Sequence, residues 1–319
     1  MLNRRPHWLD KVEPLSGLWR GLVLVALVLA SLVTMVVLPA ATQSVLPNIQ
    51  MPTLGGTQVW RDEMVRAGWR VQRHHWSGHC RLLDHKHVRR AWGSCDALYR
   101  ELQRLAPRPK SRHAVLLVHG IARGPGTFGN LPRALRAAGY DAAAISYPST
   151  RAGLDEHAWQ LKQLILRLED ADRVSFVTHS MGGLVVRKVR EDESWQAKIK
   201  PGRLVMIAPP NRGSAVAQVL KDNPAYLALY GPAGRQLVPD VAMRIAAPRI
   251  PFGILAGGKG DGAGYNPLLP GDDDGTVSVP ETRLEGAQAF KVLPRLHGII
   301  ARSPLIEPHV LSFLKSGKF

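Results

Sequence analysis

Six short runs of apolar, β-forming residues constrain the fold more than any other feature of the sequence. Amphipathic runs that predict helices follow several of them. Strands that are apolar throughout are buried on both faces, and intervening helices imply parallel crossovers. The pattern therefore predicts an α/β fold with a mainly parallel central sheet and helices on both faces. The predicted strands are residues 113–118, 141–147, 173–177, 203–208, 251–256 and 290–293, and the predicted helices lie near 130–138, near 153–169 and from about 180.

A serine stands where one predicted strand meets the helix that follows it. Residues 173–190 read RVSFVTHSMGGLVVRKVR, and Ser180 lies between the strand-forming and helix-compatible halves. A sharp strand-to-helix turn exposes such a side chain and needs small neighbours, which Gly182 provides on the helix side. The alternative is an N-cap serine on an ordinary turn. Ser180 is thus a candidate nucleophile if a base lies within reach.

Other polar motifs follow other predicted strands. The first strand ends in VHGI, so the amide of Ile121 is expected to face a substrate oxygen. Together with the amide of Met181 it would form an oxyanion hole. Residues 270–277 read PGDDDGTV, and residues 295–298 read RLHG after the last strand. The two segments contribute aspartates and His297, the residue types that activate a serine.

Taken in order, VHGIARG, THSMGGL, GDDDGTV and LHG resemble the motifs of the α/β-hydrolase superfamily, most closely of bacterial lipase- and esterase-type members. The resemblance covers residues 113–300 and implies the α/β-hydrolase fold. It implies that Ser180 is the nucleophile, His297 the general base and acid, and Asp274 the orienting carboxylate. Asp274 is preferred to Asp273 because it directly precedes Gly-Thr-Val, as in the family pattern.

One residue departs from that pattern. Thr178 stands where the family has the first glycine of the turn around the nucleophile. A β-branched side chain there requires a small group opposite it, so the geometry of the turn depends on what that group is.

The resemblance implies a serine hydrolase that cleaves carboxylic esters through an acyl-enzyme. Lipid or acyl esters are the expected substrates, because of an apolar insertion and a membrane segment elsewhere in the chain. An acyltransferase with the same triad is one alternative, and a catalytically silent, membrane-tethered binding module on the same fold is another. We expect no cofactor and no metal.

The N-terminal region predicts a membrane anchor. Residues 21–41 are uncharged and mostly apolar, and as a helix at ~1.5 Å per residue they would span ~31 Å, enough to cross a bilayer. Basic residues within 1–20 predict a cytoplasmic N-terminus, an inner-membrane location and a remainder facing the periplasm. Cleavage as a signal peptide, followed by secretion, is the alternative. Residues 42–66 predict a linker to a hydrolase domain at 67–319.

The net charge of +17, from 42 Lys+Arg against 25 Asp+Glu, is compatible with an anionic membrane surface. The sequence has no helix-turn-helix, RNP-type or zinc-finger pattern, so we expect no nucleic-acid partner. The sequence gives no prediction of oligomeric state.

Two local patterns precede the first apolar strand. Residues 68–84 predict a β-hairpin that breaks at Ser77-Gly78, and Ser94 begins a capped amphipathic helix. In an oxidising compartment Cys80 and Cys95 could form a disulfide that closes a loop of about 15 residues, or they could stay unpaired.

Three further features have two interpretations each. Residues 211–248 interrupt the alternation of strands and helices, and predict either a lid or cap or a decorated surface connection. The adjacent aspartates of 272–274 predict a solvated loop rather than a Ca²⁺ site. Clustered histidines favour structural roles over metal binding, and His119 and His179 are expected to be structural or to line the pocket. The clustered histidines are His74, His75, His79, His85 and His87.

Overall fold

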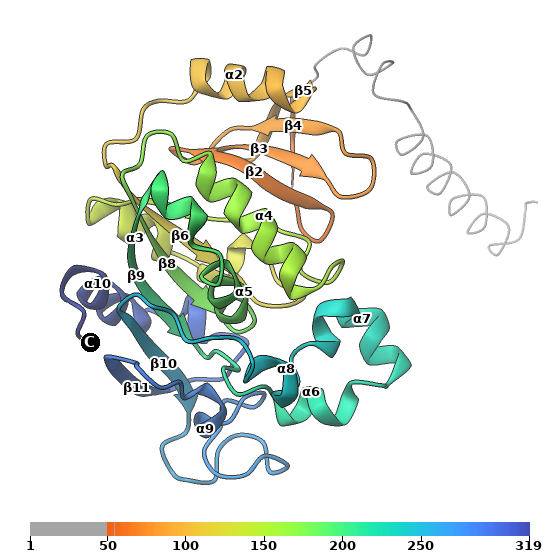
Figure 1. Cartoon of the computed structure of the whole chain (residues 1–319), viewed down its shortest axis with the longest axis vertical. Coiled ribbons are helices and arrows are strands. Elements are labelled where there is room, and N and C mark those ends of the chain that lie inside the picture. The colour runs from red at the N-terminus through yellow and green to blue at the C-terminus, as the bar shows by residue number, and fades with distance from the viewer. Residues whose placement is uncertain (1–49, 54) are drawn as a thin grey trace, which may run out of the picture. The chain divides into compact units, whose positions relative to one another are not determined.

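Two sheets make up the framework of the domain in the computed structural model, which describes residues 50–53 and 55–319 (Figure 1). One sheet is antiparallel, with strand order β1-β5-β4-β3-β2, and the other is parallel, with order β11-β10-β9-β8-β6-β7. By its internal contacts this part of the chain belongs to one unit, Pro47–Phe319.

The strands are β1 (Met51–Pro52), β2 (Trp60–Arg66), β3 (Trp69–His74), β4 (Cys80–Leu83), β5 (Val88–Gly93), β6 (His113–Val118), β7 (Asp141–Ala144), β8 (Arg173–His179), β9 (Lys200–Ile207), β10 (Phe252–Gly258) and β11 (Ala289–Pro294). The α-helices are α2 (Cys95–Leu105), α3 (Leu131–Ala137), α4 (Leu154–Leu166), α5 (Gly182–Val189), α6 (Ala215–Leu220), α7 (Pro224–Arg235), α8 (Pro239–Ala242), α9 (Val279–Thr282) and α10 (Ile306–Ser316). Short 3₁₀ turns occur at η3 (Pro125–Phe128), η4 (Glu193–Ala197) and η5 (Ile300–Arg302).

The parallel sheet explains the six apolar runs, each of which forms one of its strands. In β6, Leu116 and Val118 pack into one core with helices α4 and α5, whereas Val115 and Leu117 pack into a second core with α3 and α10. Both faces are covered, so neither set of alternating side chains meets water. The predicted parallel sheet with helices on both faces is confirmed.

The order of the strands defines where a ligand would bind. From β6 the chain moves outward to β7, then returns past β6 to β8 and continues through β9 and β10 to β11. The direction of travel therefore reverses between β6 and β8. In open parallel sheets, ligands bind beyond the carboxyl ends of the strands at such a reversal.

The antiparallel sheet corrects the predicted linker. Within the described part of 42–66, Met51–Pro52 pairs with β5, and Trp60–Arg66 is a full strand paired with β3. The Asp62 carboxylate of this strand is buried and accepts hydrogen bonds from the Ser146 amide (2.8 Å) beyond β7 and from Gln72 Nε2 (2.7 Å). The domain therefore begins before residue 67. A strand with buried acidic residues does not show the apolar pattern by which strands are recognised.

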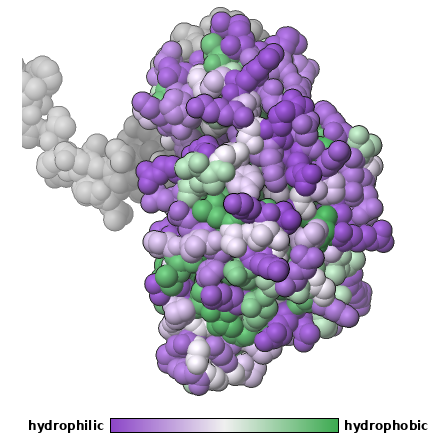
Figure 2. All heavy atoms as spheres, turned by 90° about the vertical axis from the view of Figure 1, so that its left-hand side faces the viewer, coloured by the Kyte–Doolittle hydropathy of each residue, from purple (hydrophilic) through white to green (hydrophobic). Residues whose placement is uncertain are grey.

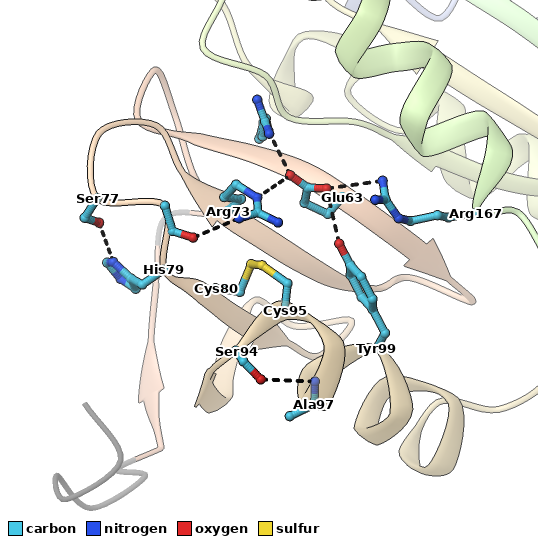
Figure 3. Close-up of a disulfide and its surroundings, with 12 residues drawn as sticks. Glu63, Arg73, Ser77, His79, Cys80, Ser94, Cys95, Ala97, Tyr99 and Arg167 are labelled. Carbon is cyan, nitrogen blue, oxygen red and sulfur yellow. Dashed lines mark hydrogen bonds and ion pairs between the residues drawn. A yellow bond between two sulfur atoms is a disulfide. The ribbon is translucent and has the colours of Figure 1, made fainter. Parts of the chain in front are cut away.

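Glu63, the next residue of β2, collects several donors (Figure 3). Its carboxylate accepts from Arg73 Nε (2.7 Å), Arg61 Nε (2.8 Å) and the Tyr99 hydroxyl (3.2 Å), and it forms an ion pair with Arg167. Burial raises the pKa of the Glu63 carboxyl, but the hydrogen bonds from Arg73 and Arg61 outweigh burial and hold the pKa below its ordinary value. The carboxylate is therefore ionised at neutral pH and links the antiparallel sheet to α2 and to the end of α4.

The predicted hairpin and capped helix are confirmed, and a disulfide joins them. Strands β3 and β4 pair antiparallel around the turn at Ser77-Gly78, and the Ser94 hydroxyl accepts from the Ala97 amide at the start of α2 (Figure 3). Cys80 of β4 and Cys95 of α2 are bonded, with their Cα atoms 5.1 Å apart. Both cysteines belong to the small core between α2 and the sheet.

Residues 211–248 form three short helices, α6 to α8, between β9 and β10 (Figure 1). Two contacts hold the later part of this insertion. Gly231 interrupts α7 with φ of 63°, and a methyl group on it would lie 1.8 Å from the Thr150 carbonyl oxygen, so only glycine fits this approach. The Gln236 side chain then accepts from the Leu154 amide (2.6 Å) at the start of α4.

A buried arginine fixes the end of the insertion. Arg187 of α5 donates to the carbonyl oxygens of Ala242 (3.2 Å), Ile245 and Asn211 (3.0 Å). Burial lowers the pKa of its guanidinium to about 10, so the group remains charged at neutral pH. Its described hydrogen bonds go to backbone carbonyls and to the Asn211 side chain, and the nearby charge of Glu191 also favours the charged form.

The surface differs between the two parts of the domain. On the face in Figure 2, hydrophilic residues predominate over the antiparallel sheet, and hydrophobic residues gather in the lower half. The 211–248 insertion, at the right of Figure 1, carries three of the most exposed large apolar side chains, Val219, Leu229 and Met243.

None of the helices between residues 50 and 319 that the structure describes has the length and apolar character needed to span a membrane. The predicted anchor at 21–41, the segment 1–20 and the first part of the predicted linker lie outside the described residues.

Removing the disulfide should destabilise the fold. Because its cysteines have a sequence separation of 15, the Cys80→Ser/Cys95→Ser variant should lose about 3 kcal/mol in free energy of unfolding, since the cross-link restricts the unfolded chain. Urea denaturation followed by circular dichroism measures this loss. Reductant should move the wild-type midpoint toward that of the variant and leave the variant unchanged; an equal midpoint for both proteins without reductant would contradict the prediction.

Candidate active site

Loops from four strands meet at the carboxyl edge of the parallel sheet. Ser180 directly follows β8, Ile121 lies in the loop after β6, Asp274 in the loop after β10, and His297 after β11. All four strands run in the same direction, so residues far apart in the sequence converge on one crevice.

The backbone at Ser180 makes a sharp turn. Ser180 has a φ of 53°, in the left-handed region that a non-glycine residue rarely adopts. Its amide donates to the Ile207 carbonyl of β9 (2.9 Å), and its carbonyl accepts from the Gly183 amide (2.9 Å). A methyl group on Gly182 would lie only 2.3 Å from the Val118 carbonyl oxygen, so α5 can start this close to β6 only with glycine there. This is the geometry of a nucleophile elbow.

Thr178 faces a glycine on the following helix. A methyl group on Gly183 would lie 3.5 Å from Thr178 Oγ1 and 3.1 Å from Pro209 Cβ. Gly183 is therefore the small residue opposite Thr178, and the tighter contact of such a methyl group would be with Pro209. The Thr178 hydroxyl is fully buried and has no hydrogen-bond partner among the described residues.

The structure brings Ser180, His297 and Asp274 into one hydrogen-bonded chain. His297 Nδ1 lies 2.7 Å from Asp274 Oδ2, and His297 Nε2 lies 2.9 Å from Ser180 Oγ. A carboxylate only accepts hydrogen bonds, so Nδ1 carries the proton and Nε2 of the neutral ring accepts from the serine hydroxyl. This is the arrangement in which a histidine removes a proton from a serine.

Asp274, not Asp273, orients the histidine. The other oxygen of Asp274 accepts from the amides of Thr276 (3.0 Å) and Val277 (2.8 Å), and the Asp274 side chain is fully buried. Asp273 instead accepts from the amides of Asn266 (3.0 Å) and Gly275 (2.5 Å), which closes its own loop. Of these two adjacent carboxylates, Asp274 therefore belongs to the site and Asp273 stabilises the loop.

The histidines beside the site have structural contacts. His179 Nε2 donates to the His297 carbonyl (3.0 Å), and His119 Nδ1 donates to the Gly120 carbonyl (2.8 Å). Burial lowers the pKa of His119 to about 4. Burial, followed by the nearby His297, holds the pKa of His179 well below its ordinary value. Both rings are therefore neutral at pH 7, which suits hydrogen bonding rather than proton transfer.

A cavity of about 350 Å³ opens beside Ser180 and His297. Ile121 lines it, and Met181 is the buried residue that precedes α5. The 211–248 insertion supplies much of the remaining wall. Its lining residues there are Ser214, Val216, Ala217, Leu220, Tyr226, Tyr230 and Leu237.

The clustered histidines of the antiparallel sheet make hydrogen bonds and ring contacts. Nδ1 atoms of His74 and His79 lie 2.8 Å and 2.5 Å from the Ser77 hydroxyl, and their rings stack at 5.2 Å. Burial, and then the charge of nearby groups, lowers the pKa of His79 to about 4. Over residues 50–53 and 55–319, no group of three or more His, Cys, Asp or Glu side chains is arranged to hold a metal ion.

Sequence reasoning missed one charged residue of the cavity. Arg123, in the motif VHGIARG, lines it two residues after Ile121. The sequence did indicate this residue, because an arginine without an acidic neighbour in a glycine-rich loop lies beside the predicted oxyanion hole. The Thr276 and Val277 amides were also missed, although Asp-Gly-Thr is a sequence in which the aspartate commonly accepts from following amides.

The strand order, the elbow and the Ser–His–Asp chain at the strand ends define the α/β-hydrolase fold. A family described as "Domain of unknown function (DUF7379)" matches residues 82–242, about half of the chain, and the chain belongs to this family. The comparison with curated proteins found no match.

Solved structures share the fold at low sequence identity. Lipase BlEst2 of Bacillus licheniformis in its mature form is 19% identical with a TM-score of 0.53, over 66% of this chain and 94% of that one. Phospholipase PlaB of Legionella pneumophila, in complex with thio-NAD, is 22% identical with a TM-score of 0.51, over 65% and 59%. The metagenomic carboxyl esterase MGS0156 is 17% identical with a TM-score of 0.51, over 65% and 77%. These similarities confirm the fold.

Replacing Thr178 by valine should stabilise the protein. The change removes a buried hydroxyl without a partner and keeps the shape of the side chain, so the free energy of unfolding should rise by about 1 kcal/mol. Thr178→Ser is the matched control: it keeps the hydroxyl, loses a buried methyl group and should lower the free energy of unfolding by about 1 kcal/mol. Urea denaturation measures both, and a less stable valine variant would show that the hydroxyl has a partner.

Proposed function

We propose that this protein is a serine hydrolase that cleaves carboxylic esters through an acyl-enzyme. The observation that carries the proposal is the hydrogen-bonded chain from Ser180 Oγ through His297 to the buried Asp274, at the wall of a cavity. The names of three proteins that share the fold, a lipase, a phospholipase and a carboxyl esterase, support ester hydrolysis.

The first half of the reaction transfers the acyl group to the enzyme. Ser180 Oγ attacks the carbonyl carbon while its proton passes to His297 Nε2, and the carbonyl oxygen becomes an oxyanion. Asp274 keeps the Nδ1 proton directed toward itself and stabilises the imidazolium. When the oxyanion collapses, the ester bond breaks, His297 gives its proton to the leaving alcohol, and Ser180 carries the acyl group.

The second half returns the enzyme to its starting state. A water molecule gives one proton to His297 Nε2 and attacks the acyl carbon, and the resulting oxyanion then collapses. Ser180 leaves as the alcohol after His297 returns the proton, and the carboxylic acid is released.

The amides of Ile121 and Met181 stabilise the oxyanion in both halves. The hydrogen bond from His119 to the Gly120 carbonyl supports this role for Ile121. In a trans peptide the carbonyl and the next amide point in opposite directions, so fixing the Gly120 carbonyl also fixes the Ile121 amide. Met181 precedes helix α5, where amide groups lack partners within the helix.

Lipid or other acyl esters are the proposed substrates. Val216, Leu220 and Leu237 of the insertion, with two tyrosines, give the cavity a mainly apolar wall. Burying an acyl chain there gains about 0.8 kcal/mol for each methylene group, so longer chains should bind more tightly until the wall ends.

Loss of the triad should abolish turnover of p-nitrophenyl esters. Ser180→Ala or His297→Ala should lower kcat by ~10⁴–10⁶. Asp274→Asn should lower it by ~10⁴, because the wrong tautomer of His297 is then favoured. Asp273→Asn is the matched control, and it should lose less than tenfold because Asp273 does not contact His297.

A fluorophosphonate should label Ser180 covalently, which reports an activated serine whatever the natural substrate. Labelling that persists in Ser180→Ala, or full activity of that variant, would contradict the proposal. An intact wild-type protein that neither reacts with the label nor cleaves any ester would instead favour a silent binding module.

The proposed location is the inner membrane, with residues 21–41 as the anchor and the hydrolase domain in the periplasm. The uncharged apolar run and the basic residues before it support this orientation. The Cys80–Cys95 disulfide supports it independently, because disulfides persist in oxidising compartments.

An epitope placed after Phe319 should test this location in a bacterial host. Antibody should label it on spheroplasts without permeabilisation, and the protein should fractionate with membranes. A cytoplasmic protein with the same epitope is the control. Labelling only after permeabilisation would reverse the orientation, and a soluble periplasmic product would instead indicate signal cleavage.

A further inference from the structure

The cavity beside the triad has a positive charge that nothing in it balances. Arg123 is the one described lining residue with a permanent charge, and no aspartate or glutamate lines the cavity. The other ionisable groups of the lining are His179, His297, Tyr226 and Tyr230, none of which supplies a negative charge at neutral pH.

The guanidinium of Arg123 has no partner of its own. Within residues 50–53 and 55–319 no carboxylate forms an ion pair with it, and its side chain donates no hydrogen bond. Most arginines of the antiparallel sheet behave differently: Arg61, Arg70 and Arg73 each pair with an acidic residue. A free guanidinium at a cavity is a donor available to a ligand.

The loop that carries Arg123 is held in place. The Gln58 side chain donates to the Arg123 carbonyl (2.7 Å) and to the Ser149 hydroxyl (3.0 Å), and its oxygen accepts from the Thr150 amide (3.1 Å). Gln58 comes from the segment before β2, so the start of the domain supports the backbone of the loop after β6.

The position of the Arg123 guanidinium indicates which part of a bound ester it would contact. Nη2 of Arg123 lies 3.1 Å from the position of a methyl group on Gly298, the residue after the triad histidine. His297 gives its proton to the alcohol oxygen, so the alcohol part of the ester leaves beside His297. The guanidinium therefore lies on the His297 side of the site, where we expect the alcohol part, while the apolar wall of the insertion is available to the acyl chain.

We propose that Arg123 binds an anionic group, a carboxylate or a phosphate, on the alcohol part of the ester substrate. This inference rests on the proposed ester hydrolysis and narrows it to one substrate class: acyl esters of acidic alcohols. A planar guanidinium binds either group through two parallel hydrogen bonds.

Two pairs of butyrate esters test the inference, and in each pair only one member has an anionic group on the alcohol part. The first is 4-carboxyphenyl butyrate against 4-carbamoylphenyl butyrate, followed by release of the phenol. The second is 1-butyrylglycerol 3-phosphate against 1-butyrylglycerol, followed by titration of the acid. Full-length protein in a non-ionic detergent should show a kcat/KM about fivefold higher for the anionic member of at least one pair.

The variants separate Arg123 from the general positive charge of the protein. Arg123→Gln should bring the ratio of anionic to neutral turnover close to that of the uncatalysed esters, and Arg123→Lys should keep part of the preference. Arg108→Gln is the matched control, because Arg108 is exposed like Arg123 but does not line the cavity. The preference of the wild type should also weaken as salt rises from about 20 to 500 mM.

The outcomes are distinct. A larger ratio in the glycerol pair identifies phosphate as the preferred group, and a larger ratio in the phenyl pair identifies carboxylate; both support the inference. The same ratio in wild type and Arg123→Gln overturns it, even if Ser180-dependent turnover is present. Absence of Ser180-dependent turnover for all four esters overturns the proposed hydrolysis, and this inference with it.

Discussion

The close approach of helix α5 to the end of strand β6 is the constraint on which the candidate site depends. The first turn of α5 lies against the Val118 carbonyl, at a distance that leaves no room for a side chain on Gly182. Because of this approach the chain must turn sharply at Ser180, which takes a left-handed backbone conformation and turns its hydroxyl toward His297. The same approach brings the loop after β6, with Ile121 and Arg123, beside the serine. The backbone strain at Ser180 is offset by the two buried cores that hold the sheet and helices.

Much of this could be predicted from the sequence because the relevant information is local. A strand buried on both faces is mostly apolar, so β6 and β8 to β10 were visible as runs, whereas β11, in which only Leu293 is buried, was visible through Phe290, Val292 and Leu293. In a parallel sheet, motifs that follow strands meet at one edge, which allowed Ser180, Asp274 and His297 to be grouped although they are far apart in sequence. Even the choice of Asp274 over Asp273 follows from local sequence, since the turn after it supplies the amides that hold its carboxylate.

The features that sequence reasoning missed depend on contacts between distant segments. Strand β2 was assigned to a linker because its acidic residues break the apolar pattern of a strand. The Asp62 carboxylate can be buried there because Ser146 and Gln72 donate hydrogen bonds to it. Thr178 was left unexplained because its neighbour across the elbow, Gly183, becomes evident only in three dimensions. In each case the residue that contacts the polar or bulky side chain is distant in the sequence or on another element, and the spacing of apolar residues does not identify it.

The carbonyl contacts of Arg187 limit how the cavity could change shape. They attach the end of the insertion to the same helix that begins beside the nucleophile. Gly231 packs against Thr150, and Gln236 accepts from the first residue of α4, so the later part of the insertion is also held. What remains between Ser214 and Gly231 is α6 and the first part of α7, which carry Leu220, Tyr226 and Tyr230 of the cavity wall. A cavity of another shape would therefore require this short arch to move, because the contacts of Arg187 and Gln236 hold the rest of the insertion.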